Sequence, residues 1–333
     1  MKITDDFLEK FENALQLDIR YYIKNITYLI STDIASAFFG LLLSVSFAYF
    51  VSKEIYGQYN YIISIFMFLA ILSLPGINSG ITIAVKKGFE GNFPYGFSVR
   101  FRWSFLGTLI LIAVGLYYYF SGSIILGKAF IATSLIFPLF HSSDALFGFL
   151  PGKERFGLMA KYRVSIQAIS SLIAIVFIYF IPDLLYIVVA YLFSNALIKF
   201  YFVIKSKNLV RSRNIDTELV RYGKKLTLMQ TLPFIAMYID RILIANFIGF
   251  EELAIYSFAI VLPEHIRGFM RNLQHILLPK LSVADNVVIK KNMVRYFLIL
   301  LAISVLVTVT YIIFAPFVYD ILFPQYDKSV YYS

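Results

Sequence analysis

Four polar side chains share one face of a predicted apolar helix in the last third of the sequence. Glu264, Arg267, Arg271 and His275 follow one another at spacings of three and four residues in PEHIRGFMRNLQH. At about 100° per residue, these four positions lie within about 80° of one another. Guanidinium groups bind phosphate and carboxylate groups through paired hydrogen bonds. The stripe therefore predicts either an anion-binding face or a set of buried ion pairs.

Two interpretations of this stripe stay open. A charged group at membrane depth costs on the order of 3 kcal/mol, so the stripe must face protein or water. It either lines a water-filled cavity, or Glu264 pairs with Arg267 and fixes the helix to a neighbour while Arg271 reaches the lipid headgroups.

Other charged residues also fall inside apolar stretches. Asp240 and Arg241 are adjacent, so on a helix they point about 100° apart and each needs another partner. An arginine of the following helix is one candidate partner for Asp240. His141 and Asp144, three residues apart, fit an ordinary hydrogen-bonded pair better than a proton relay. Asp33 is a lone carboxylate near one end of the first apolar stretch.

Catalytic and metal-binding motifs are missing from the sequence. It contains no phosphate-binding loop, no cluster of metal ligands and no nucleophile with a neighbouring base. It also has no cysteine, which excludes disulfides and thiol catalysis. We therefore expect no enzymatic activity, no cofactor and no bound metal.

The composition predicts that these residues sit on membrane-spanning helices. Of the 333 residues, 59% are hydrophobic and 15% are charged, and the mean hydropathy is +0.75. Apolar runs long enough to cross the ~30 Å hydrocarbon layer recur along the chain, without the alternation of barrel strands. We expect nine spanning helices, at about 26–51, 60–85, 104–120, 124–150, 163–181, 184–204, 226–248, 252–278 and 296–319.

Leu74-Pro75-Gly76 falls inside the second of these stretches. Proline removes a backbone donor and disturbs the preceding turn, so the helix should be interrupted there. We expect Pro75 and Gly76 to form a hinge, although simple accommodation of packing explains a kink equally well.

The distribution of lysine and arginine predicts the orientation. These residues gather in alternate connections, including one that we take to contain Arg100 and one that starts at Lys199. Because basic residues are retained in cytoplasmic loops, we expect a cytoplasmic N-terminus in the plasma (inner) membrane. The net charge of +10 then reflects topology, not nucleic-acid binding.

The longest basic connection divides the predicted helices into six and three. We therefore expect an interfacial amphipathic segment (1–24), an N-terminal six-helix bundle (25–205), a basic cytoplasmic linker (206–225) and a partial C-terminal bundle of three helices (226–333). A weak internal repeat aligns FVSKEIYGQY (50–59) with FIGFEELAIY (247–256). Such a parallel repeat is typical of alternating-access transporters.

Three stretches carry a family resemblance. YIDRILIANFIGFEELAIYSFAIVLPEHIRGFMRNLQHILLPKLS (238–282), FVSKEIYGQYNYIISIFMFLAILSLPGINSGI (50–81) and LFPQYDKSV resemble the Wzx-type O-antigen and capsule polysaccharide flippases. Their superfamily also contains lipid II flippases and multidrug and toxin extrusion exporters. The resemblance implies an all-α membrane protein of two six-helix bundles around a central cavity. Against that pattern the sequence stops after nine helices, so we expect a C-terminally truncated chain with an incomplete second bundle.

The resemblance also assigns roles to the charged residues. It implies a flippase for an undecaprenyl-pyrophosphate-linked oligosaccharide, with Arg267, Arg271 and Arg241 at the pyrophosphate and sugar and with Glu264 and His275 on the same binding face. It also places the first helix along the cavity, where Asp33 could bind H⁺ or Na⁺. The other two candidates for H⁺ or Na⁺ coupling are Asp144 and Asp240.

Three alternatives to the flippase remain. In a cation-coupled multidrug exporter, the acids would matter more than the arginines. A membrane-bound glycan polymerase or glycosyltransferase usually needs a large polar catalytic loop, and the longest connection here is short and mostly basic. A truncated scaffold that does not transport is the third.

Overall fold

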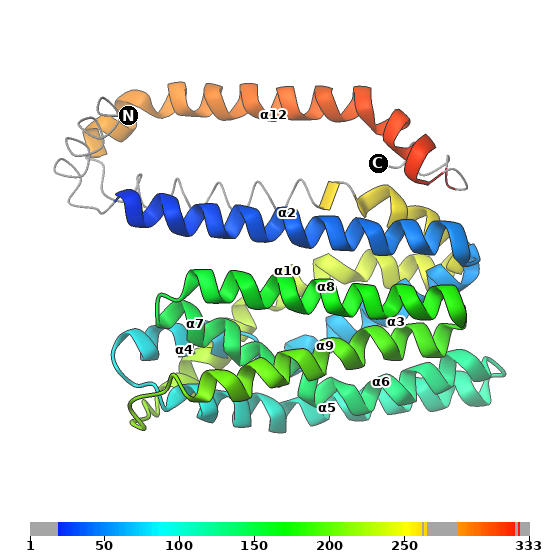
Figure 1. Ribbon diagram of the computed structural model, residues 1–333, viewed down its shortest axis with the longest axis horizontal. Helices are drawn as coiled ribbons and strands as arrows, with labels where there is room; N and C mark the ends of the chain where they lie inside the picture. Colours follow the sequence, from blue (N-terminus) through cyan, green and yellow to red (C-terminus); the bar gives the residue numbers. More distant parts are fainter. Residues whose placement is uncertain (1–18, 262, 265–285, 324–325, 327–333) are drawn as a thin grey trace. The chain divides into compact units, whose positions relative to one another are not determined.

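The computed structural model describes residues 19–261, 263–264, 286–323 and 326 (Figure 1). Every regular element in that part of the chain is a helix, which confirms the predicted all-α class. The residues group into two compact units: residues 36–258, and residues 1–35 together with 259–333.

The 36–258 unit is a bundle of helices. It comprises the end of α2 (Ile19–Phe50), α3 (Lys53–Phe68), η1 (Leu69–Ser73), α4 (Ile77–Lys86), α5 (Asn92–Phe120), α6 (Ile124–Ser142), η2 (Ser143–Ala145), α7 (Leu146–Gly152), α8 (Phe156–Phe180), α9 (Leu184–Lys207), α10 (Leu219–Phe247) and the helical residues 250–258.

The helices of this bundle pack in a chain of neighbours. α5 lies along α6, α6 along α9 and α9 along α8, while α10 packs on α3 and α4 (Figure 1). Buried phenylalanines such as Phe66, Phe130 and Phe137 fill the interior. Lipid tails are as apolar as these side chains, so in a bilayer close packing and polar contacts stabilise such a bundle more than exclusion from water does.

Local sequence signals set several helix ends. The Ser52 hydroxyl accepts a hydrogen bond from the Ile55 amide at the start of α3, and the Asp183 carboxylate accepts one from the Leu185 amide at the start of α9. These side chains satisfy amide groups that have no partner within the helix. Gly122 follows α5 with a φ of 95°, a conformation that glycine adopts without steric cost.

The second predicted helix is interrupted at the expected place. Leu74 has a φ of 56° in the left-handed region and separates η1 from α4. Residues before proline avoid the right-handed helical region, which explains the interruption ahead of Pro75. The Gly76 amide donates to Thr227 Oγ1 of α10 at 3.1 Å, and a Cβ at Gly76 would lie 2.5 Å from the Gly223 carbonyl oxygen. The break therefore holds α4 directly against the α10 backbone, while a hinge motion stays a prediction.

Seven helices in the described residues are long and apolar enough to cross a membrane. The chain is thus a multi-pass membrane protein, while the expected total of nine spans stays a prediction. The seven stretches are Ser31–Phe50, Lys53–Ser73, Asn92–Phe120, Ile124–Gly152, Phe156–Phe180, Leu184–Lys207 and Arg221–Phe247.

Two of the cations that we predicted in loops are buried inside helices instead. α5 begins at Asn92, earlier than the expected start near 104, and α9 continues to Lys207. Arg100 and Lys199 are therefore helical and buried, not loop residues at a membrane surface. The prediction was wrong because it assigned both cations to connections, whereas a cation with a buried partner is tolerated inside a span.

The two segments of the weak repeat contact each other within the 36–258 unit. A Cβ at Gly57 would lie 1.8 Å from the Phe250 carbonyl oxygen, so the two backbones touch there. The Tyr61 ring lies 5.6 Å from the Phe250 ring, and Asn246 of α10 donates to the Tyr61 hydroxyl at 3.2 Å. Small residues at such crossings allow helices to approach closely.

The other unit contains the start of α2 and all of α12 (Asn286–Leu322). The fully buried Tyr319 of α12 donates its hydroxyl proton to the Ala259 carbonyl oxygen at 2.9 Å. Most of the predicted interfacial segment 1–24 lies outside the described residues, and α2 is already helical from Ile19.

Candidate functional site

A cluster of charged side chains lies inside the 36–258 unit. Lys199 of α9 donates to Asp144 Oδ1 of η2 at 2.8 Å, and Arg100 Nη2 of α5 lies 3.8 Å from Asp144 Oδ2. The Arg100 side chain is 2% exposed and the Lys199 side chain 10%, whereas Asp144 is 25% exposed. One carboxylate thus holds two cations that come from different helices.

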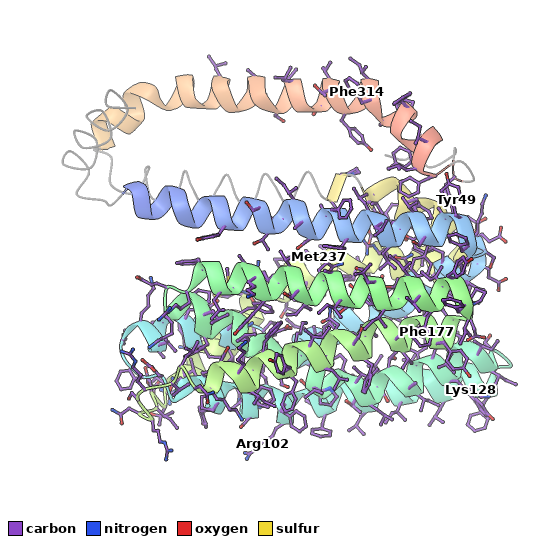
Figure 2. The ribbon with its side chains drawn as sticks, in the orientation of Figure 1. Tyr49, Arg102, Lys128, Phe177, Met237 and Phe314 are labelled. Atoms are coloured by element: carbon purple, nitrogen blue, oxygen red, sulfur yellow. The ribbon has the colours of Figure 1, made fainter. Side chains whose placement is uncertain are left out.

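Arg100 also spans the break in the second predicted helix. Its Nη1 donates to Asn78 Oδ1 at 2.7 Å, and its Nη2 donates to Ser73 Oγ at 3.1 Å. Ser73 precedes the break and Asn78 follows it, so a single guanidinium joins the two sides. Arg102, two residues further along α5, is exposed and projects from the bundle (Figure 2). Arg100 therefore has these partners because of its position on α5, and the other arginine of this helix does not share them.

His141 borders the cluster and packs against aromatic rings. Its ring lies among those of Phe66, Phe137 and Phe140, at centroid distances of 5.1, 4.4 and 5.0 Å. Its Nδ1 is 3.9 Å from Asp144 Oδ2. The Lys199 ammonium lies 3.6 Å from the centre of the Phe140 ring, a cation–π contact. The apolar surroundings strengthen each of these electrostatic contacts relative to water.

With His141 neutral, the cluster carries one more positive than negative charge. An unpaired buried charge is costly, so the carboxylate is needed to retain both cations. Two buried nitrogens, Arg100 Nε and His141 Nε2, have no hydrogen-bond partner among the described residues. The surplus positive charge and these two nitrogens suit a further anion or a water molecule.

A second polar contact involves α10. The Tyr256 hydroxyl donates to Asp240 Oδ2, and the Arg241 amide donates to Asp240 Oδ1 at 2.8 Å. The sequence suggested an arginine of the following helix as a partner for Asp240, and those arginines lie outside the described residues. A tyrosine partner was not foreseen.

Comparison with known proteins places the chain in a family. A family model described as "Polysaccharide biosynthesis protein" matches residues 22–271, which is well over half of the sequence. The chain belongs to this family. The match includes α3 to α10 and therefore the whole charged cluster. A search of curated proteins and a search of solved structures found no match.

In this polysaccharide biosynthesis protein, sequence reasoning found only half of the cluster. It paired His141 with Asp144, and the structure brings these two side chains within 3.9 Å. It missed Arg100 and Lys199 as partners. A signal was present for Lys199, since Asn195 lies four residues earlier on the same face of a mostly apolar helix.

The remaining predicted site residues are spread over both units. Asp240 and Arg241 belong to the 36–258 unit, whereas Asp33 and Glu264 belong to the other. Asp33 is partly buried and Glu264 is exposed. Three further candidates lie outside the described residues: Arg267, Arg271 and His275. The substrate-binding and ion-coupling roles of these residues stay predictions.

Proposed function

We propose that this polysaccharide biosynthesis protein is a flippase for an oligosaccharide linked to undecaprenyl pyrophosphate. The family match over residues 22–271 carries the proposal, because the family suggests a polysaccharide or lipid-linked oligosaccharide as the transported molecule. Seven apolar helices support it further, since a flippase must sit in the bilayer that holds the lipid tail of its substrate. The transported molecule crosses from the cytoplasmic to the outer leaflet, and no bond of it is made or broken.

The proposed mechanism is alternating access, with the pyrophosphate held by arginines. Arg241, Arg267 and Arg271 suit this role because planar guanidinium groups bind phosphate oxygens in pairs. Glu264 and His275 would contact the sugars from the same face. In this scheme the lipid tail stays in the bilayer while the polar headgroup crosses through the protein.

The break at Leu74-Pro75-Gly76 is the proposed bending point. Arg100 joins Ser73 to Asn78 across it, so bending must strain or break at least one of these hydrogen bonds. Hinges are commonly a few residues at element ends that absorb the change in backbone angles. Arg100 would thus couple the shape of the break to the state of Asp144.

Asp33, Asp144 and Asp240 are the proposed H⁺ or Na⁺ coupling sites. Protonation of Asp144 would leave the Lys199 and Arg100 charges without their carboxylate, which favours a rearrangement of both. A proton entering the cluster would therefore loosen the attachment of Arg100. This step links ion entry to movement at the break.

A deletion strain tests the proposed function. Loss of the gene should remove surface polysaccharide and leave the lipid-linked oligosaccharide in the inner leaflet, and the wild-type gene should restore export. Arg241→Ala should lower export at equal protein abundance, whereas Arg102→Ala, which alters an exposed arginine of α5, should not. Unchanged surface polysaccharide in the deletion strain, together with new sensitivity to cationic drugs, would favour a multidrug exporter instead.

A further inference from the structure

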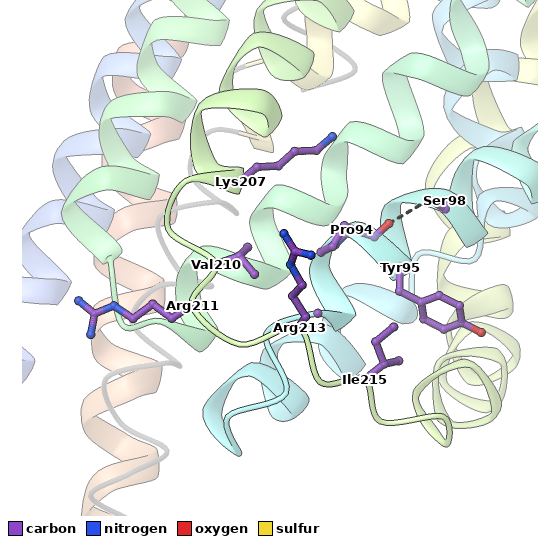
Figure 3. Close-up of a pocket in the computed structure, with 9 residues that line it drawn as sticks. Pro94, Tyr95, Ser98, Lys207, Val210, Arg211, Arg213 and Ile215 are labelled. Atoms are coloured by element: carbon purple, nitrogen blue, oxygen red, sulfur yellow. Dashed lines mark hydrogen bonds between the residues drawn. The ribbon is translucent and has the colours of Figure 1, made fainter.

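A basic pocket opens at one end of the 36–258 unit. Its volume is about 760 Å³, and it lies between the first turns of α5, the end of α9 and the connection that follows α9 (Figure 3). Its lining includes the side chains of Tyr95, Ser98, Lys207, Arg211, Arg213 and Ile215.

The connection that forms one wall is fixed to the start of α5. The Asp216 amide donates to Asn92 Oδ1 at 2.8 Å, and Asn92 Nδ2 donates back to the Asp216 carbonyl oxygen at 3.2 Å. Glu90 Oε2 accepts from the Arg211 amide at 2.6 Å while Oε1 binds Lys153 at 2.7 Å. The wall is therefore held in place before any ligand arrives.

Glu90 remains ionised while it holds this wall. Burial alone would raise the pKa of its carboxyl group. Hydrogen bonds from the Lys153 ammonium and the Arg211 amide outweigh burial and lower that pKa below its usual value. The attachment of the connection consequently persists at neutral pH.

The pocket has an uncompensated positive charge. Its described lining contains Lys207, Arg211 and Arg213 but no acidic side chain. Among the described residues, the charged side-chain nitrogens of these three form no ion pair with a carboxylate, although the Arg211 backbone amide donates to Glu90. In Figure 3, the Arg213 side chain extends toward the space between Val210 and Pro94, whereas that of Arg211 extends away. Lys207 and Arg213 are thus the cations best placed for a ligand.

Apolar surface continues from the pocket along the spanning helices. The ring of Phe97 on α5 stacks on that of Phe101 and lies 6.1 Å from the ring of Phe200 on α9. Tyr201 and Ile215 are exposed. Both α5 and α9 are apolar enough to span a membrane, so the pocket lies where the ends of two spans meet the polar surface. A ligand with a phosphate and an acyl chain matches both features.

We propose that this pocket binds the headgroup of an anionic phospholipid from the adjoining leaflet. The Arg213 guanidinium would bind two phosphate oxygens, and the Lys207 ammonium would add a point charge. Ser98 belongs to the same lining, and its hydroxyl group, which donates to the Pro94 carbonyl oxygen at 3.0 Å, can still accept a hydrogen bond from the headgroup. Basic pockets at the ends of membrane helices recognise lipid phosphates in this way. The binding is independent of which molecule the protein transports.

The chain offers a built-in reporter for this lipid. Trp103 is its only tryptophan, and it lies on α5 eight residues after Tyr95, about 12 Å further along the helix axis. It is also partly exposed. Bromine atoms on an acyl chain quench tryptophan emission over short distances. The full chain is reconstituted in phosphatidylcholine vesicles that contain brominated phosphatidylglycerol or, in parallel, the same fraction of brominated phosphatidylcholine.

We expect brominated phosphatidylglycerol to quench Trp103 more strongly than brominated phosphatidylcholine. Lys207→Ala and Arg213→Ala should each lower the preference by about fivefold. The control variant Arg155→Ala/Lys161→Ala removes two exposed cations outside the pocket, one at the N-cap of α8 and one within α8. It should keep the preference for brominated phosphatidylglycerol.

Three results would overturn the assignment. Equal quenching by the two brominated lipids would show that the headgroup is not recognised. An undiminished preference in the folded Lys207→Ala/Arg213→Ala variant would place recognition elsewhere. A preference seen only in phosphate-free buffer, and absent at millimolar inorganic phosphate of the same ionic strength, would show that the pocket is a site for soluble phosphate and not for a lipid.

Discussion

Replacing Asp144 by asparagine should destabilise the protein strongly without changing the shape of the side chain. Asparagine nearly preserves the size of aspartate but removes the charge that holds Lys199 and Arg100. Both cations have side chains that are at most 10% exposed, so water cannot take over from the carboxylate. Removing one member of a buried ion pair typically costs about 3–5 kcal/mol.

A second substitution shows whether charge causes that loss. In Asp144→Asn/Lys199→Met, the unpaired ammonium is gone, while Arg100 keeps Asn78 and Ser73 as acceptors. The double variant should therefore be more stable than Asp144→Asn alone. Such non-additivity is expected for residues in one network and measures their coupling directly.

The assay is reversible or kinetic unfolding of the full purified chain in detergent, followed by circular dichroism. Glu154→Gln is the control, because it removes one member of the exposed Lys86–Glu154 pair, whose side chains are more than half exposed. That change should cost less than about 1 kcal/mol. Equal stability of Asp144→Asn and Glu154→Gln would contradict a stabilising role of the Asp144 charge. So would a double variant Asp144→Asn/Lys199→Met that is no more stable than Asp144→Asn alone.

Three further predictions concern other contacts. Glu90→Gln should weaken the attachment of the α9–α10 connection and raise the rate of amide hydrogen exchange at Arg211. Because the pKa of Glu90 is lowered, the wild-type amide should stay protected above the usual carboxyl pKa and lose protection only as the pH falls through the lowered pKa. Loss of this protection already near neutral pH would contradict the prediction. Gly76→Ala should lower the free energy of unfolding by about 1–3 kcal/mol, measured by thermal unfolding, since its Cβ would lie 2.5 Å from the Gly223 oxygen. The control Ser79→Ala, on the exposed side of α4, should leave stability unchanged, and equal stability of the two variants would refute the close contact. Tyr256→Phe should lower stability by about 1.5–3 kcal/mol by removing the hydrogen bond to Asp240, whereas Tyr222→Phe at an exposed position of α10 should not, as compared by the same unfolding assay.

The sequence predicted the helices well because bilayer thickness leaves long apolar runs with few alternatives. The interruption at Leu74-Pro75-Gly76 was also predictable, because proline acts on its immediate neighbours. The start of α5 was not predictable, since a charged residue such as Arg100 is assigned to a loop until its buried partners are known. Charge alone does not distinguish a cation at the membrane surface from one that is paired inside a bundle.

The site was harder to predict than the helices. His141 and Asp144 are three residues apart, so helical spacing alone predicted their contact. Asn78, Arg100 and Lys199 are far apart in the sequence, and their meeting depends on how three helices, α4, α5 and α9, are rotated about their axes. Hydropathy patterns do not determine these rotations. The contacts of Arg100 therefore became visible only in the structure.

Transport by the purified chain is the direct test of the proposed flippase function. The full chain is reconstituted in vesicles with a fluorescent polyprenyl-pyrophosphate oligosaccharide in the inner leaflet, and a glycan-cleaving enzyme is added outside. We expect the protected glycan to become cleavable with time, faster than in vesicles without protein. Cleavage no faster than in protein-free vesicles, with the chain shown to be folded, would contradict the proposed flippase function.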